Sequence, residues 1–305
     1  MFIEQGIDIN NKFWKYILGS MFIIGASFVG QLPMLAMILF QTSFQGKVYP
    51  TTDQELMNFF EPNLNLFLLL ISFVFALGGI YFAVRFLHKQ AFLSIVTSRK
   101  KMDWKRVFFS FFVWSIFTVV STLLICYLNP ADFKANFQLI PFLILVAIAT
   151  LLVPIQTSVE ELIFRGYLMQ GFANLWGNKW FPLLMTSIIF GLMHLFNPEV
   201  TKMGNIIMVY YIGTGFLLGI MTLMDDGMEL ALGFHAANNL IGALLVTSDW
   251  SAFQTYSIFK DVSEPEAGLD IIFPVVVIYP LLLIIFGVKY NWSGWKEKLT
   301  GTIVK

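Results

Sequence analysis

Charged residues are scarce in this chain. Only 12% of its 305 residues carry a charge and 57% are hydrophobic, whereas a soluble domain has about 25% charged residues. The mean hydropathy is +0.74. This composition excludes an ordinary soluble enzyme and predicts an integral membrane protein that crosses the bilayer several times.

Cysteine is almost absent, and neither sign of charge is in excess. The single cysteine, Cys126, lies in an apolar run, which excludes an internal disulfide and a cysteine-based metal cluster. Acidic and basic side chains balance at 19 each, so the net charge is zero and no nucleic-acid partner is expected. The first twelve residues, MFIEQGIDINNK, carry acidic residues before the first lysine, so we expect no cleavable signal peptide.

Long apolar runs are abundant instead. A spanning helix needs roughly 20 mostly apolar residues, and eight segments are candidates: 14–40, 64–87, 107–128, 139–175, 180–196, 204–224, 228–247 and 271–288. The fourth is too long for one simple span, and Pro154 inside it predicts a bend or a break. The predicted fold is an all-α, polytopic membrane helical bundle of about eight transmembrane helices.

The positions of lysine and arginine define the expected orientation. If there are eight spans, most of the basic residues fall on one side of the membrane: Lys12, Lys15, Lys89, Arg99, Lys100, Lys101, Lys105, Arg106, Lys289, Lys296, Lys298 and Lys305. The positive-inside rule then places both termini in the cytoplasm. The basic loop 88–106 is interpreted as a topology signal, with binding of anionic lipid headgroups as the alternative.

A few polar residues stand inside the apolar runs. They occur in SVEELIFRGYL, FGLMHLF and GFHAANN, and the residues concerned are Glu160, Glu161, Arg165, His194, His235 and Asn239. Ionisable residues within spans are costly and usually face the interior of the bundle, so they are functional candidates by default.

Helical spacing suggests how the residues of the first motif divide. Glu161 and Arg165 are four residues apart, share a helix face and can neutralise each other. Glu160 is rotated by roughly 100° from Glu161 and has no obvious local partner. His235 and Asn239 are also four apart and present one polar face.

Depth in the membrane gives an independent expectation. The fourth and fifth segments form a hairpin around the turn WGNK at 176–179. Glu160 and His194 each lie roughly 23 Å from that turn at 1.5 Å per residue, so the hairpin can bring them to one level. A carboxylate beside an imidazole in a low-dielectric cavity can deprotonate water. Donors on a second helix can stabilise an oxyanion, so the set predicts peptide hydrolysis.

The three motifs together resemble the CAAX protease and bacteriocin-processing (CPBP, or Abi) family of intramembrane endopeptidases. The family pattern EExxxR, FxxxH and HxxxN is matched by EELIFRG, FGLMH and HAANN. The resemblance implies a catalytic core at 139–250 and additional N-terminal transmembrane helices at 1–138 within one membrane domain, 1–305. It implies that Glu160 activates water with His194, that Glu161 and Arg165 shape the site, and that His235 and Asn239 stabilise the oxyanion.

Several alternatives stay open. Glu160, His194 and His235 can in principle hold zinc, although the HExxH spacing is absent; the metal-free mechanism is favoured. A catalytically silent immunity or scaffold protein and a proton-coupled transporter are the rival functions. The expected partners are the lipid bilayer and a membrane-associated peptide or protein tail. The family's distribution suggests a bacterial cytoplasmic membrane, with bacteriocin immunity as one associated role.

Polar residues outside these motifs receive structural interpretations. His88 is expected at the membrane interface among lysines. Asp225, Asp226 and Glu229 are expected to be solvated in a short turn before the seventh segment. Phe190 is interpreted as packing. Asn238 stands beside Asn239, so either amide can face the site.

Overall fold

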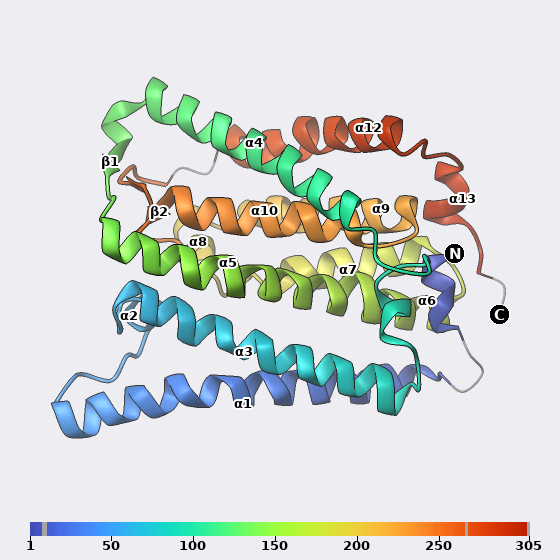
Figure 1. Cartoon of the computed structure of the whole chain (residues 1–305), viewed down its shortest axis with the longest axis horizontal. Coiled ribbons are helices and arrows are strands. Elements are labelled where there is room, and N and C mark those ends of the chain that lie inside the picture. The colour runs from blue at the N-terminus through green and yellow to red at the C-terminus, as the bar shows by residue number, and fades with distance from the viewer. Residues whose placement is uncertain (8–10, 266–267, 304–305) are drawn as a thin grey trace.

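The protein is an elongated bundle of helices that lie along its long axis (Figure 1). The structure, a computed structural model, describes residues 1–7, 11–265 and 268–303. Within these residues six helical segments are long and apolar enough to cross a membrane. They are Phe13–Gln45, Pro62–Leu87, Trp104–Leu128, Leu139–Trp176, Ile207–Asp225 and Ile271–Lys289. The predicted polytopic helical membrane bundle is confirmed.

The helices α1 (Phe13–Gln45) and α3 (Pro62–Phe82, continued by a π-helix at Ala83–Leu87) form one edge of the bundle. The helices α4 (Trp104–Leu128) and α12 (Tyr279–Lys289) lie at the opposite edge (Figure 1). Helix α5 (Leu139–Glu161) and helix α10 (Glu229–Leu245) pack against each other between these edges. Polar groups on α5 and α10 are therefore kept away from the surrounding lipid.

The remaining two predicted spans are shorter than expected. Helix α7 (Trp180–Leu192) has 13 residues, and the chain turns at 193–196, where we expected the helix to continue. Helix α10 has 17 residues and is buried along most of its length, because it packs against α4, α5 and α9 (Ile207–Asp225). These two central helices carry His194 at the end of α7 and His235 on α10.

The fourth predicted span is one continuous helical segment. The chain passes through Pro154 without a break, so of the expected bend or break the break does not occur. Prolines are tolerated in membrane helices because neighbouring groups can satisfy the freed backbone groups. The irregularity comes later, where α5 gives way to a π-helix at Leu162–Leu168 before α6 (Met169–Trp176). The π-helix begins directly after Glu161, and such turns are frequent at functional sites.

A small sheet covers the end of the bundle that lies opposite the termini (Figure 1). It comprises β1 (Phe133–Ala135), β2 (Val246–Ser248) and β3 (Phe259–Asp261) in the order β1-β3-β2. Strand β3 pairs antiparallel with β1 and parallel with β2, with Phe133 opposite Asp261. The sequence patterns did not predict this sheet.

Short helices complete the fold. The α-helices are α2 (Asp53–Met57), α8 (Pro198–Met203), α11 (Leu269–Phe273) and α13 (Trp295–Thr300). Turns of 3-10 helix occur at Phe2–Gly6, Phe92–Ile95 and Pro130–Asp132, and a further π-helix at Pro274–Ile278. The first 3-10 helix and α13 lie at the same end of the bundle (Figure 1). This arrangement agrees with an even number of crossings, and the cytoplasmic orientation stays a prediction.

Candidate functional site

The predicted pair Glu161–Arg165 is present at the start of the π-helix. Both side chains are fully buried, and Arg165 Nη1 lies 3.0 Å from Glu161 Oε1. Arg165 Nη2 donates to the carbonyl of Gly215 at 3.2 Å, and its guanidinium lies 4.3 Å from the centre of the Phe190 ring. Arg165 thus neutralises one carboxylate and connects α5 to α7 and α9.

His235 joins the two adjacent carboxylates. Its Nδ1 lies 2.7 Å from Glu161 Oε1, and its Nε2 lies 3.5 Å from Glu160 Oε2. We call Glu160, Glu161, Arg165 and His235 the carboxylate cluster. With His235 protonated, the four charges cancel, which suits a site where an uncompensated charge is costly. Helical spacing within α10 predicts only that His235 and Asn239 share a face. The sequence therefore did not predict the contact of His235 with the two carboxylates of α5.

Glu160 has a local partner, contrary to the expectation from spacing. Gln156, one turn earlier on α5, donates from Nε2 to Glu160 Oε1. Nothing in the sequence indicated this role for Gln156, because its side chain is a neutral amide. Among the described residues, neither Glu160 Oε2 nor Glu161 Oε2 accepts a hydrogen bond, and both atoms are buried. The Glu160 side chain as a whole is 16% exposed, whereas that of Glu161 is fully buried. Of the two carboxylates, Glu160 is therefore the one whose side chain is partly accessible.

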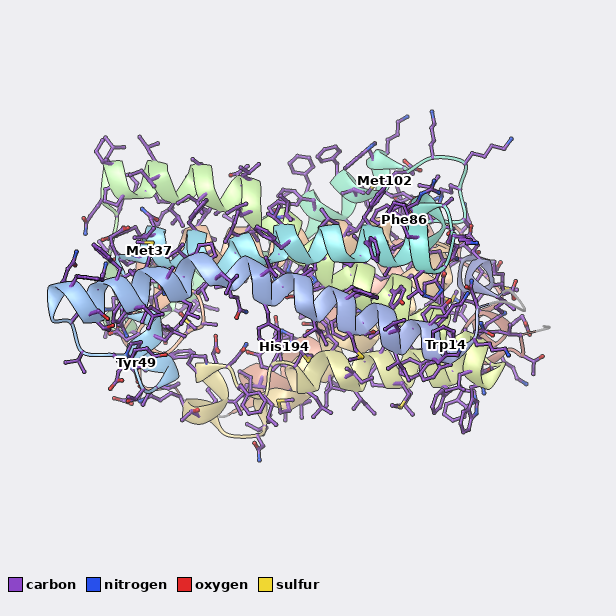
Figure 2. All side chains as sticks on the ribbon, turned by 90° about the horizontal axis from the view of Figure 1, so that it is seen from below. Trp14, Met37, Tyr49, Phe86, Met102 and His194 are labelled. Carbon is purple, nitrogen blue, oxygen red and sulfur yellow. The ribbon has the colours of Figure 1, made fainter. Side chains whose placement is uncertain are left out.

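His194 lies in the turn that follows α7. Figure 2 shows it about half-way along the bundle. Its Nδ1 lies 2.8 Å from the carbonyl oxygen of Phe190, which can only accept a hydrogen bond, so Nδ1 carries a proton. In the neutral ring Nε2 then keeps its lone pair. The ring stacks on Tyr211, with 4.4 Å between ring centres.

Phe190 is packing, as expected, but it packs inside the site. Its ring centre lies 4.8 Å from that of His194 and 5.9 Å from that of His235. The same ring contacts the guanidinium of Arg165. Phe190 therefore separates the two histidines with an apolar surface and limits how far either ring can turn.

The choice between the two adjacent asparagines follows from their partners. Asn239 Nδ2 donates to Gln156 Oε1 at 3.2 Å, which places Asn239 beside the carboxylate cluster. Asn238 accepts from the indole of Trp114 on α4 at 3.1 Å. Of the two, Asn239 is the residue that faces the site.

The alternative zinc ligands are not arranged for a metal. Within the described residues, no group of three or more His, Cys, Asp and Glu side chains could hold a metal ion. Nδ1 of His235 contacts Glu161 at 2.7 Å, and its Nε2 lies 3.5 Å from Glu160 Oε2. As placed, the three residues do not form a metal-binding group; the metal-free mechanism stays a prediction, and no step below involves a metal.

Two of the three carboxylates around the start of α10, Asp225 and Glu229, are buried, whereas the Asp226 side chain is 30% exposed. Arg99 lies 3.1 Å from Asp225 Oδ2 and 3.0 Å from Glu229 Oε2. Arg106 pairs with the other oxygen of Asp225, and Asp226 pairs with a lysine of α13. The prediction of solvated carboxylates was wrong for Asp225 and Glu229, because the basic loop after α3 folds back over them. Part of the topology signal therefore serves as a structural ion network.

His88, directly after the apolar segment Pro62–Leu87, is buried among other side chains. Its Nε2 lies 2.8 Å from the hydroxyl of Tyr167, and its Nδ1 lies 3.1 Å from Asn11 Oδ1. Burial, and secondly the charge of Lys15, lower the pKa of His88 to about 4. The neutral imidazole ties the end of the α3 segment to the π-helix that follows the carboxylates.

The segment that holds these site residues matches a known protein family. The family described as "Type II CAAX prenyl endopeptidase Rce1-like" matches residues 137–241, which include the carboxylate cluster, His194 and Asn239. The chain is 32% identical over 248 residues to the "Uncharacterized protein YyaK" of Bacillus subtilis (strain 168), covering 81% of this chain and 82% of YyaK. No solved structure gave a significant match.

Proposed function

Because this chain belongs to the Rce1-like family of type II CAAX prenyl endopeptidases, we propose that it is an intramembrane endopeptidase whose general base is Glu160. The observation that carries the proposal is the asymmetry of the two carboxylates. Glu161 is fully buried and paired with Arg165, whereas the Glu160 side chain is 16% exposed and its nearest partner at Oε1 is the neutral amide of Gln156. A general base must come within reach of the proton that it removes.

The chemistry follows from the positions of these groups. Glu160 Oε2 takes a proton from water, and the water oxygen forms a bond to the carbon of the scissile carbonyl. The carbonyl electrons move to its oxygen, giving a tetrahedral oxyanion. When the C–N bond breaks, Glu160 returns the proton to the leaving amine. His194, with its proton held on Nδ1 by Phe190, accepts a hydrogen bond from the water at Nε2 and orients it.

Two donors are available for the oxyanion. Nε2 of His235 lies on the side of Glu160 and acts as a donor when it carries a proton, and Asn239 has one N–H beyond the one given to Gln156. Preorganised donors act strongly in a site from which water is excluded, and each contributes about 3–4 kcal/mol of barrier lowering in well-studied acyl-transfer enzymes. We assign oxyanion stabilisation to His235 and Asn239.

The position of His194 along the bundle suggests the substrate class. His194 lies about half-way along the bundle (Figure 2), so a scissile bond must enter the bundle to reach it. We propose a membrane-associated peptide or protein tail as the substrate and the bilayer as the surrounding partner. The Bacillus relative favours a bacterial cytoplasmic membrane.

Peptide cleavage by purified protein in detergent tests the proposal. Wild type and Glu160→Gln are compared on a library of membrane-tail peptides, with Glu264→Gln, an exposed loop carboxylate, as the matched control. We expect cleavage by wild type and by the control and a loss of at least about 100-fold in Glu160→Gln, because the base is gone.

The same assay separates the alternatives. Cleavage that a chelator abolishes and zinc restores would replace the metal-free mechanism by a zinc-dependent one. Equal behaviour of wild type and Glu160→Gln across a broad library would reject the protease. A silent immunity or scaffold protein, or a proton-coupled transporter, would then take its place.

A further inference from the structure

A row of hydrogen bonds leads from α4 across α10 to Glu160. The indole Nε1 of Trp114 donates to Asn238 Oδ1 at 3.1 Å, and Asn238 Nδ2 donates to Asn239 Oδ1 at 3.1 Å. Asn239 Nδ2 donates to Gln156 Oε1 at 3.2 Å, and Gln156 Nε2 donates to Glu160 Oε1. We call these five residues the amide relay.

Both ends of the amide relay have a fixed direction. An indole N–H can only donate, and an ionised carboxylate can only accept. Each of the three amides between them accepts with its oxygen and donates with its nitrogen, so all three point the same way. Turning over any one amide would place two donors or two acceptors against each other. Because Trp114 donates at one end of the relay, Gln156 must direct its Nε2 donor towards Glu160 at the other end.

The donor end is held rigidly. Trp114 is only 6% exposed, and its ring centre lies 4.4 Å from that of Phe234 on α10 and 4.9 Å from that of Phe117 on α4. Gln156 is 5% exposed. An indole packed between two aromatic rings cannot swing its N–H away from Asn238, so the direction of the relay is maintained by core packing far from the carboxylates.

From this arrangement we propose that Gln156 is a positioning residue for Glu160 and that Trp114 sets its orientation through Asn238 and Asn239. The inference rests on the proposed function of Glu160 as a base. By binding Oε1, Gln156 stops rotation of the carboxylate and leaves Oε2 as the oxygen that meets the water. Asn239 then has two roles: it orients the amide of Gln156, and it donates its second N–H to the oxyanion.

The helices do not need the relay to associate. Helices α5 and α10 are already joined by the contact of Glu161 with His235, which the relay does not include. Helices α4 and α10 are joined by Ser110, which donates to the carbonyl of Leu230 at 2.7 Å. Loss of the relay is therefore expected to alter the reaction more than the fold.

Steady-state kinetics test the role of Gln156. Gln156→Met keeps the length of the side chain and removes its donor. We expect kcat to fall on the order of 10- to 100-fold with KM unchanged, because a misplaced catalytic group costs about this much. Trp114→Phe should lower kcat in the same way, and the double variant should lose little more than Gln156→Met. Gln138→Met and Trp104→Phe, exposed residues at the starts of α5 and α4, are the matched controls.

A second measurement does not depend on activity. The indole N–H resonance of Trp114 is followed by NMR in wild type, Gln156→Met and Gln138→Met. We expect it to move in Gln156→Met, three hydrogen bonds away along the relay, and to stay in place in Gln138→Met. A resonance that does not move in Gln156→Met would overturn the relay.

The outcomes separate this inference from the proposed function. If wild type cleaves peptides and Gln156→Met cleaves them with the same kcat, the positioning role is wrong and the protease stands. If kcat, KM and the melting temperature of Gln156→Met all change together, Gln156 is only structural. If wild type cleaves nothing, the positioning role falls with the proposed base, whatever the indole resonance does.

Discussion

Replacing Arg165 tests how much its charge stabilises the buried carboxylate cluster. Arg165→Met keeps most of the buried volume and removes the charge that faces Glu161 at 3.0 Å. It also removes the hydrogen bond to Gly215 and the contact with the Phe190 ring. Removing one partner of a buried ion pair costs about 3–5 kcal/mol, because the remaining charge is buried and unpaired. We expect a loss of unfolding free energy in this range.

The second half of the experiment isolates the charge from the packing. Glu161→Gln combined with Arg165→Met removes both charges and should recover at least about 1.5 kcal/mol, because replacing a whole buried pair is far less costly than breaking it. Unfolding is followed by circular dichroism in mixed micelles of detergent and denaturant. A cost below about 1 kcal/mol for Arg165→Met, the range of surface pairs, would refute the reasoning. So would a double variant that is no more stable than Arg165→Met.

Two further predictions concern the scaffold. Because burial lowers the pKa of His88 to about 4 from an ordinary 6.5, the unfolded chain takes up the proton first. Stability is therefore complete above about pH 6.5 and falls by about 1–2 kcal/mol, solvent screening included, as the pH drops towards 4. Melting curves against pH check this, and His88→Gln should remove that part of the slope. An added Cβ at Gly233 would lie 2.1 Å from the carbonyl oxygen of Val107, so Gly233→Ala should cost about 1–3 kcal/mol by forcing α10 from α4. Gly242→Ala on the same helix meets nothing within 4 Å and should be neutral or stabilising; equal melting temperatures for both variants would contradict the packing argument.

Much of the bundle could be read from local sequence. Each of the eight predicted apolar segments contains helix, because only a helix satisfies its own backbone hydrogen bonds in lipid. The pairing of Glu161 with Arg165 was also predictable, since residues four apart on one helix are always neighbours. Where sequence and structure agree, the interaction lies within one helix or follows from composition alone.

The tertiary structure decided which helix faces meet. His235 lies 74 residues after Glu161, and only the packing of α10 against α5 brings its ring to both carboxylates. The same packing buries Glu229, which the sequence placed in a solvated turn, and encloses it with Arg99 from a distant loop. Helical periodicity describes the surface of one helix at a time and carries no information about the neighbour that will cover it. The charges that make this site were therefore visible in the sequence, whereas their partners, and the partial exposure of Glu160, depend on how the helices pack.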